Sequence, residues 1–360
     1  MQAQGVIARK AGEQAQVEDF VVDDPGPGEV RVRIEASGVC HTDLLYQQGD
    51  AGDNFPFLLG HEGAGTVEAT GPRVTRLQEG DYVILAWRGP CGKCRFCSIG
   101  LLHLCPDNLT APGRMHTRDG QDLVAVGGVG TFCTHTVVNA AQAIKVSREV
   151  PAPQASLIGC GVMTGVGAVL YTAGVRRGST VAVFGCGGVG ASVIQGARIA
   201  RARQIIAVDI APQKLEQAKR FGAADVVDAR EGDPGDRIKE LTEGNGVDYA
   251  FESAGRPDTL EQALWCRDLA GTCVMIGMAG PGATLELPLQ RFFGQGGSLR
   301  VSWYGDCLPS RDFPMLADWY LKGDLKLDEL VSRRIGLGET EDAYHAMHDG
   351  KTMRSVIVLD

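Results

Sequence analysis

The chain has 360 residues, of which 44% are hydrophobic and 22% charged, and its formal net charge is −9. This length favours two domains with well-packed cores, and the composition is typical of a globular enzyme rather than a disordered chain. A negative chain without a run of Lys and Arg excludes nucleic acid and anionic membrane surfaces as main partners.

The N-terminal segment Met1–Gly12 lacks the apolar core of a signal peptide. We expect no stretch to approach the roughly 20 apolar residues that cross a bilayer, and therefore a cytoplasmic protein without a membrane partner. The eleven cysteines are an odd number, which does not allow complete disulfide pairing, and a reducing cytoplasm disfavours disulfides. Metal binding is therefore the first hypothesis for any cysteine cluster.

Short strand-like runs dominate the chain from Val6 to about Val150. In segment 30–34 apolar and charged residues alternate, and Pro and Gly mark a turn at 24–28. The first part of the chain is therefore predicted to be mostly β.

From about Ser156 the pattern changes to strands alternating with helices. A strand at 180–184, a helix at 189–200 and a strand at 205–208 predict a βαβ unit. A helix at 214–221 and strands at 225–227, 247–251 and 272–277 continue the alternation. This pattern predicts an α/β fold with a doubly wound parallel sheet.

Beyond about Ser302 the alternation stops. An amphipathic segment at 313–321 and a last strand at 355–359 follow, and this strand can return to the first domain. We therefore expect one domain at 1–155, completed by 304–360, and a second domain at 156–303.

The run Gly185-Cys186-Gly187-Gly188-Val189-Gly190 fits the dinucleotide-binding fingerprint, directly after a strand and at the start of a helix. The three glycines of the motif permit a tight turn, close approach of the pyrophosphate and close helix packing. Asp209 ends the next strand, where an acid accepts hydrogen bonds from ribose hydroxyls and repels a 2′-phosphate. NAD is thus favoured over NADP. A glycine-rich turn that binds no nucleotide is the alternative, and the strand, helix and acid together weigh against it.

Four cysteines lie within fifteen residues: Cys91, Cys94, Cys97 and Cys105. Two Cys-x-x-Cys steps allow four thiolates to surround one zinc, and such a closed site is structural because it leaves no position for a substrate. A redox dithiol or an iron–sulfur cluster are the alternatives.

Cys40, His61 and Cys160 are less obvious candidates, each with a glycine within two positions. Taken alone, each cysteine fits an inert buried thiol and the histidine fits a satisfied core residue. The residues by themselves leave this choice open.

The run Gly60-His61-Glu62-Gly63-Ala64-Gly65, followed by Gly71 and Val74, resembles the signature of zinc alcohol dehydrogenases. The cysteine cluster and the nucleotide fingerprint lie at the distances that this family shows, so the resemblance spans nearly the whole chain. It implies a mostly-β, GroES-like catalytic domain and a Rossmann domain that binds NAD. It also implies two zinc ions per subunit, one catalytic and one structural.

The resemblance assigns the catalytic zinc to Cys40, His61 and Cys160, with a fourth position for water or substrate oxygen, the arrangement for which alcohol dehydrogenase is the standard example. Glu62 is then a neighbour that transiently ligates the metal, and Asp43 orients the histidine. The resemblance also assigns the proton relay to Thr42, contacts with the cofactor pyrophosphate to His41 and Arg354, and contacts with the nicotinamide to Thr164 and Ile276. It assigns contacts with the adenosine ribose to Lys214, next to Asp209 and Ile210, and it places Trp87 in the substrate pocket. Many relatives have a histidine where this chain has Leu45, so water or the cofactor ribose is left to complete the relay.

A finer resemblance concerns the substrate. Segments 55–62, 157–163, 302–309 and 348–356 look like those of S-(hydroxymethyl)mycothiol dehydrogenases. That resemblance implies oxidation of the adduct of formaldehyde with a thiol, here mycothiol. A dehydrogenase of simple primary or aromatic alcohols is the alternative.

A third hypothesis is a binding protein that has kept the fold and lost catalysis. The presence of Cys40, Thr42, His61 and Cys160 argues against it. The family also implies a homodimer or homotetramer. The other histidines and cysteines are expected to be surface or packing residues, because none has ligand spacing with a partner.

Overall fold

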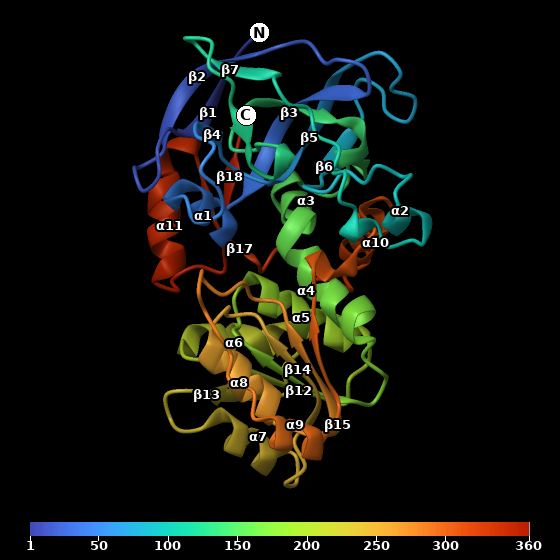
Figure 1. Cartoon of the computed structure of the whole chain (residues 1–360), viewed down its shortest axis with the longest axis vertical. Coiled ribbons are helices and arrows are strands. Elements are labelled where there is room, and N and C mark those ends of the chain that lie inside the picture. The colour runs from blue at the N-terminus through green and yellow to red at the C-terminus, as the bar shows by residue number, and fades with distance from the viewer. Residues whose placement is uncertain (360) are drawn as a thin grey trace. The chain divides into compact units, whose positions relative to one another are not determined.

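The computed structural model describes residues 1–359, and the chain divides into two compact units (Figure 1). Unit 1 contains Met1–Cys160 and the chain from Leu308 onward, and unit 2 contains Gly161–Cys307. The chain therefore leaves unit 1 once and returns to it. These boundaries lie a few residues after the positions 155 and 303 expected from the sequence.

Unit 1 is built around two β-sheets (Figure 1). The five-stranded sheet has the order β7-β2-β1-β4-β8, formed by Met115–Thr117, Gln16–Val22, Gln2–Ala8, Phe57–Leu58 and Val124–Ala125. The seven-stranded sheet has the order β10-β6-β5-β3-β18-β17, with β9 also paired with β3; its strands are Ala143–Lys145, Tyr82–Leu85, Glu62–Thr70, Glu29–Gly38, Arg354–Val358, Val331–Ile335 and His135–Asn139. The last strand, β18, pairs with β3, so the predicted return of the chain end to the first part is confirmed.

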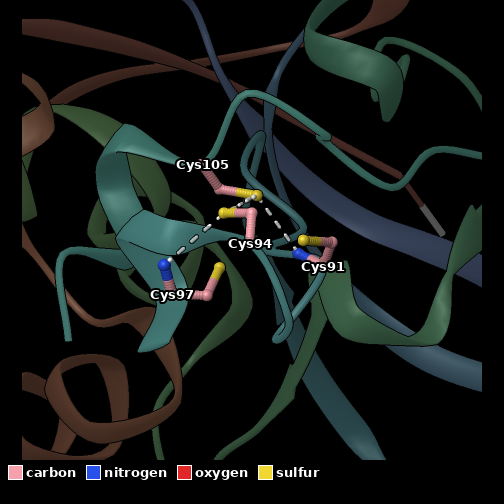
Figure 2. A group of neighbouring side chains, drawn as sticks. All are labelled: Cys91, Cys94, Cys97 and Cys105. Atoms are coloured by element: carbon pink, nitrogen blue, oxygen red, sulfur yellow. Dashed lines mark hydrogen bonds between the residues drawn. The ribbon is translucent and has the colours of Figure 1, made fainter. Parts of the chain in front are cut away.

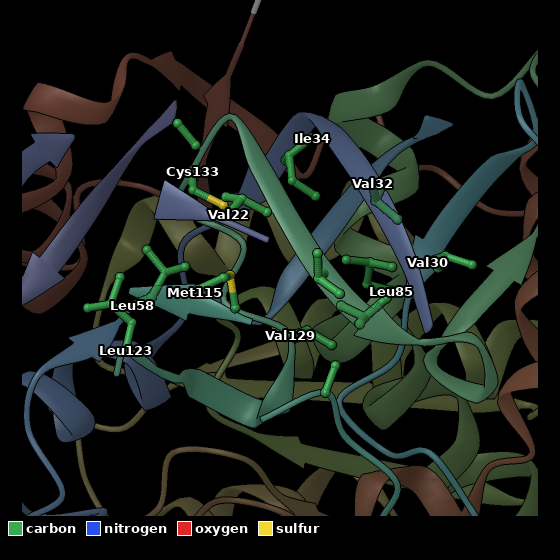
Figure 3. Packing of buried hydrophobic residues seen from close by; sticks show 14 of the residues in the cluster. Val22, Val30, Val32, Ile34, Leu58, Leu85, Met115, Leu123, Val129 and Cys133 are labelled. Atoms are coloured by element: carbon green, nitrogen blue, oxygen red, sulfur yellow. The ribbon is translucent and has the colours of Figure 1, made fainter. Parts of the chain in front are cut away.

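The core of unit 1 lies between these sheets and follows from strand periodicity (Figure 3). Along β3, Val30, Val32 and Ile34 are buried while the arginines between them are half-buried, because successive side chains point to opposite faces. Leu58 and Met115 from the other sheet belong to the same cluster. Burial of each such side chain stabilises the fold by about 1.5–3 kcal/mol.

The helices of unit 1 connect and flank these sheets. The α-helices are α1 His41–Gln48, α2 Arg95–Ser98, α3 Ala152–Leu157, α10 Pro309–Leu321 and α11 Thr340–His348. Short 3-10 turns occur at Leu102–Leu104, Val126–Gly128, Ala140–Gln142 and Leu337–Glu339. The predicted amphipathic segment at 313–321 lies within α10, which begins at Pro309 because proline is well tolerated in a first helical turn.

The expectation that no stretch is long and apolar enough to cross a bilayer is wrong for the continuous helical run at 152–173. It comprises α3, the π-helical turn η4 (Ile158–Val162), α4 (Met163–Gly167) and the π-helical turn η5 (Ala168–Ala173). The run is 22 residues long with a mean hydropathy of 1.5 in its most apolar window, enough by length and composition to span a membrane. However, 78% of that window is buried within the protein, as in a core helix.

Unit 2 contains one six-stranded sheet with the order β13-β12-β11-β14-β15-β16, and every pairing in it is parallel. Its strands are β11 Thr180–Phe184, β12 Gln204–Asp209, β13 Asp225–Asp228, β14 Val247–Glu252, β15 Arg267–Met275 and β16 Ser298–Val301. Its other helices are α5 Gly188–Ile199, α6 Pro212–Phe221, α7 Pro234–Leu241, α8 Pro257–Trp265, α9 Leu289–Gln295 and the 3-10 turn Tyr304–Asp306. The order 3-2-1-4-5-6 reverses between β11 and β14, where dinucleotides bind in such sheets.

The sheet of unit 2 is buried on both faces, as expected for parallel strands. Every residue of β11 is buried. Ala182 and Phe184 belong to a core cluster with Ile238 of α7 and Leu264 of α8. The residues of β11 that alternate with these two therefore point to the opposite face of the sheet, toward the helices that cover that face. The predicted α/β fold with a doubly wound sheet is confirmed.

Candidate active site

Cys40 lies at the junction between β3 and α1 and is the N-cap of that helix. Its backbone is extended, and its N–H donates to Asp43 Oδ2 at 3.0 Å while the N–H of Asp43 donates to the Cys40 carbonyl at 3.2 Å. This reciprocal capping satisfies backbone groups that a helix start leaves unpaired. It therefore fixes Cys40 and Asp43 relative to each other.

His61 follows a turn that only glycine permits. Gly60 has φ +89°, and a Cβ there would collide with the backbone of Phe132. The His61 side chain is buried, and its Nδ1 is 2.7 Å from Asp43 Oδ1. Because Nδ1 is engaged by the carboxylate, Nε2 is the ring atom left to act as a ligand.

Cys160 comes from the π-helical turn η4. A Cβ at the preceding Gly159 would lie 2.9 Å from the carbonyl oxygen of Leu85, so glycine allows this turn to pack against β6. Ligand atoms of Cys40, His61, Glu62 and Cys160 all lie within 4.8 Å of one another. The fold thus brings together the three separate residues that the sequence by itself left open, and the two cysteines remain partly exposed.

The electrostatics of this group favour a thiolate. A hydrogen bond from Cys160 and the nearby His61 lower the pKa of Cys40 well below its usual value, against the effect of burial. Burial acts to lower the pKa of His61, but the charges of Asp43 and Cys40 raise it well above its usual value. Burial raises the pKa of Glu62 to about 7 although Arg354 opposes that change.

Glu62 and Arg354 form a buried ion pair. Arg354 Nη2 also donates to the Val39 carbonyl at 3.1 Å, and the arginine is only 7% exposed. Arg354 is therefore not a solvated surface charge, and the pair satisfies a charge that burial would otherwise disfavour. The pyrophosphate contact expected of Arg354 stays a prediction.

Three other expected residues lie around the group. The Thr42 hydroxyl is 3.7 Å from Cys40 Sγ, and His41 at the start of α1 is exposed. Trp87 lies beside His61: a Cβ at Gly127 would be 2.9 Å from Trp87 Cβ and 3.2 Å from His61 Cβ. Leu45, in place of a relay histidine, is half-buried on α1.

Cys91, Cys94, Cys97 and Cys105 form a second cluster, in which all four sulfurs lie within 4.8 Å (Figure 2). Backbone N–H groups point at two of them: Cys91 N is 3.3 Å from Cys105 Sγ, and Cys97 N is 3.5 Å from Cys94 Sγ. The N–H of Cys97 is the main cause that lowers the pKa of Cys94 to about 7. Four converging thiols with backbone donors are typical of a closed metal site.

The nucleotide fingerprint lies between β11 and α5. Gly185 has φ +85°, and a Cβ at Gly190 would overlap the Gly185 carbonyl oxygen. At Gly187 no atom of the described chain, apart from its immediate chain neighbours, lies within 4 Å of the position of a Cβ. Each glycine therefore has the steric role expected of it: turn, open approach and close packing.

Asp209 lies at the end of β12 and faces the fingerprint. Its Oδ2 accepts from Cys186 N at 2.7 Å and its Oδ1 from Ala211 N at 2.9 Å. The carboxylate thus holds the glycine turn in place, and its contact with a cofactor ribose stays a prediction. This role of Asp209 is not visible in the sequence, because it depends on the approach of the ends of β11 and β12.

The other expected cofactor residues also lie in unit 2. Thr164 is on α4, next to Gly165, whose Cβ would be 2.5 Å from the Val189 carbonyl oxygen of α5. Ile210 is 66% exposed after β12, and Lys214 on α6 and Ile276 after β15 are half-buried. Their contacts with a cofactor stay predictions.

The cysteines and histidines to which no ligand role was given lie outside both clusters. The cysteines among them, Cys133, Cys186, Cys266, Cys273 and Cys307, are all buried, as expected. His116 is held between Asp23 and Asp122, and His135 pairs with Glu68.

Comparison with known proteins gives two family matches. Residues 26–148 match the alcohol dehydrogenase GroES-like domain, and residues 188–322 match the zinc-binding dehydrogenase domain. The S-(hydroxymethyl)glutathione dehydrogenase of Saccharomyces cerevisiae is 37% identical over 98% of this chain and 95% of its own.

Two solved structures are similar over the whole chain. An alcohol dehydrogenase zinc-binding domain protein from Burkholderia ambifaria has a TM-score of 0.95 and 35% identity, covering 100% of this chain and 99% of its own. Benzyl alcohol dehydrogenase from Acinetobacter calcoaceticus has a TM-score of 0.93 and 30% identity, covering 100% of both chains.

These matches agree with the two clusters and the nucleotide fold. The cofactors of such an oxidoreductase are zinc and NAD. The chain belongs to the zinc-type medium-chain alcohol dehydrogenase family.

Proposed function

We propose that this enzyme oxidises the S-(hydroxymethyl) adduct of a thiol with NAD, at a zinc ion held by Cys40, His61 and Cys160. The observation that carries the proposal is the meeting of these residues, from three distant segments, within 4.8 Å. Two thiolates and one imidazole leave the fourth position of a tetrahedral zinc for a substrate oxygen.

The residues fit a zinc ion. Glu62 Oε1 is buried without a hydrogen-bond partner among the described residues, and one carboxylate oxygen of Glu62 lies within 4.8 Å of both sulfurs. An unpartnered buried carboxylate oxygen costs free energy unless a cation or a donor satisfies it. Glu62 is therefore a candidate for occasional ligation of the same ion.

When bound, zinc supplies Lewis-acid polarisation of the substrate oxygen, and NAD supplies the hydride acceptor. The carbon of the hydroxymethyl group loses a hydride, its oxygen loses a proton, and the C–O bond becomes the carbonyl of an S-formyl product. The Thr42 hydroxyl, which lies beside Cys40, would take this proton while passing its own to water or to the cofactor ribose. Asp43 keeps the His61 ring oriented through the 2.7 Å contact.

The second zinc belongs to the four-cysteine cluster. The four sulfurs would occupy all four positions of that ion, so its role would be structural. The proposal therefore requires two zinc ions per chain.

The fingerprint fits NAD. In the described chain no side chain caps the N-terminus of α5, so its first N–H groups remain free for the pyrophosphate. The open space at Gly187 admits the phosphates, and the charge of Asp209 disfavours a 2′-phosphate.

We take a thiol adduct as the first candidate substrate because relatives are named for that activity, among them the enzymes of Saccharomyces cerevisiae and Synechocystis. Those names specify glutathione. We propose mycothiol for this chain on the resemblance of segments 55–62, 157–163, 302–309 and 348–356. The general reaction and the choice of thiol are thus separate parts of the proposal.

The test is NAD reduction with formaldehyde plus mycothiol, formaldehyde plus glutathione, and formaldehyde alone. Activity that needs mycothiol supports both parts. Activity that needs glutathione keeps the reaction and overturns the choice of thiol.

Oxidation of a simple aromatic alcohol is the second candidate, favoured by the likeness to benzyl alcohol dehydrogenase. Equal rates with benzyl alcohol and with the thiol adducts would overturn the adduct assignment in favour of this candidate.

The proposal includes a homodimer or homotetramer in the cytoplasm. Edge strand β16 leaves backbone groups unpaired in the described chain, and Val301 on this strand is 58% exposed. Leu289 and Phe293, on the preceding helix α9, are 74% and 89% exposed. A second copy covering this edge would bury Val301. Light scattering of Val301→Lys should then give a smaller assembly than the parent, and an unchanged mass would overturn this interface.

A further inference from the structure

The segment that follows Cys105, the last residue of the four-cysteine cluster, is hydrogen-bonded to the segment that contains Trp87. We call residues 105–110 the strap. Arg88 Nη2 donates to the Cys105 carbonyl, and Leu109 N donates to the Gly89 carbonyl at 2.7 Å. The strap is therefore attached to segment 87–89 on both sides of Asn108.

Asn108 completes this attachment with both ends of its amide. Its Nδ2 donates to the Trp87 carbonyl at 3.2 Å, and its Oδ1 accepts from Gly89 N at 2.5 Å. One side chain thus fixes the backbone on both sides of Arg88. Such paired contacts set the position of a segment more firmly than a single bond does.

Trp87, the first residue of segment 87–89, lies near His61 of the candidate zinc site. Gly127 has φ +62°, and a Cβ there would contact the Cβ atoms of both Trp87 and His61. The strap also reaches the neighbouring glycine, because a Cβ at Gly128 would overlap the Thr110 side chain. The strap therefore contacts both segment 87–89 and Gly128, the residue after the glycine that lies against Trp87 and His61.

We propose that Asn108 is a positioning residue that sets the place of Trp87 beside His61, and that through Cys105 the four-cysteine cluster acts on substrate selection as well as on stability. The inference rests on the proposed function, because Trp87 matters for selection only if substrates bind at His61. Loss of the Asn108 contacts frees the Trp87 backbone while leaving all seven proposed zinc ligands in place.

The comparison variant is Asn245→Ala, set against Asn108→Ala. Asn245 Nδ2 donates to the Thr242 carbonyl at 3.1 Å in unit 2, so this substitution removes the same kind of bond outside the site. Asn108→Asp is a third variant, which keeps the acceptor for Gly89 N and loses the donor to Trp87.

The first measurement is the ratio of kcat/KM for benzyl alcohol to that for ethanol, with zinc content measured on the same samples. We expect Asn108→Ala to change this ratio by about tenfold, mostly through KM of the larger alcohol, as a misplaced pocket wall does. Asn245→Ala should leave the ratio unchanged at the same zinc content. Equal loss for both alcohols in Asn108→Ala would indicate a purely structural role and overturn the proposal.

The second measurement does not need turnover, so it separates failure of the inference from failure of the proposed function. The chain has four tryptophans, and replacing Trp265, Trp303 and Trp319 with Phe leaves Trp87 as the only indole. Asn108→Ala and Cys97→Ser should both shift its emission to longer wavelength and increase quenching by acrylamide, and Asn245→Ala should do neither. Unchanged emission in Asn108→Ala would overturn the inference even if the enzyme is an active dehydrogenase.

Discussion

Glu62 and Arg354, which lie 292 positions apart in sequence, form a buried ion pair at the starts of β5 and β18. Glu62 is fully buried and Arg354 nearly so. The pair joins the two chain segments of unit 1 directly beside Cys40 and Cys160. The C-terminal strand is thus part of the environment of the candidate zinc site.

The first prediction follows from this pair. Glu62→Gln should lower the free energy of unfolding by about 3–5 kcal/mol, because it leaves a buried arginine without its counter-charge. The double variant Glu62→Gln/Arg354→Met should recover much of that loss. Urea unfolding of the zinc-loaded proteins measures both, and a double variant less stable than the single one would contradict this account.

The second prediction concerns the residue that orients His61. Asp43→Asn should weaken zinc binding at the catalytic position by about 10- to 100-fold, because the imidazole loses its charged acceptor. Zinc retained per chain against a competing chelator measures the effect. Asp122→Asn is the matched control, since it removes a carboxylate from another histidine, His116, away from both clusters. Equal zinc loss in the two variants would argue against an orienting role for Asp43.

Local patterns predict most of unit 2, because its strands are buried on both faces and its turns carry glycine. The strand at 180–184 and the acid at Asp209 lie where the sequence places them. The helical run at 152–173 is not predicted, since its glycines lower helix propensity. Two of those glycines are needed for packing: Gly159 against Leu85 and Gly165 against Val189.

The two metal clusters also differ in how far the sequence alone predicts them. Cys91 to Cys105 are close in sequence, so their spacing alone indicates a site. Cys40, His61 and Cys160 come together only through the pairing of β3 with β5 and the turn η4, and family resemblance is what identifies them. The contacts of Asn108 cannot be predicted from spacing at all, because they join a side chain to backbone atoms about twenty positions away.

The third prediction is a pH dependence of stability at His116. Its hydrogen bond to Asp23 raises the pKa of His116 above the usual value, although burial opposes this, and Asp122 adds to it. The folded state therefore favours the protonated ring, so the stabilisation is complete below about pH 6.5 and is lost as the pH rises through the raised pKa. Because both carboxylates are well exposed, the contribution should be below about 1 kcal/mol.

The measurement is the urea midpoint of His116→Gln and the parent between about pH 5.5 and 8.5. The two midpoints should differ most at the acid end and converge at the alkaline end. A constant offset at every pH would contradict the assignment.

The fourth prediction concerns cofactor choice. Asp209→Asn should lower kcat/KM for NAD by about 10- to 100-fold, the usual worth of a hydrogen bond to a charged group, and should raise the use of NADP. The amide keeps one acceptor oxygen for the glycine turn, so the fold should persist. Asp228→Asn, at the position paired with Asp209 on the next strand, is the control. An unchanged NAD to NADP ratio would mean that Asp209 serves the turn alone.

The fifth prediction separates the two roles of the fingerprint glycines. Gly190→Ala should prevent the turn from closing, because the methyl group would overlap the Gly185 carbonyl oxygen. Gly187→Ala should fold normally, since no described atom apart from its immediate chain neighbours lies within 4 Å of the added methyl group, but it fills the space through which a pyrophosphate reaches α5. For Gly190→Ala we therefore expect mainly a lower melting temperature. For Gly187→Ala we expect an unchanged melting temperature and weaker NAD binding, measured by titration calorimetry. Normal NAD binding by Gly187→Ala would show that the open face of this turn is not where the cofactor lies, and the nucleotide site would then have to be sought elsewhere along the carboxyl ends of the strands.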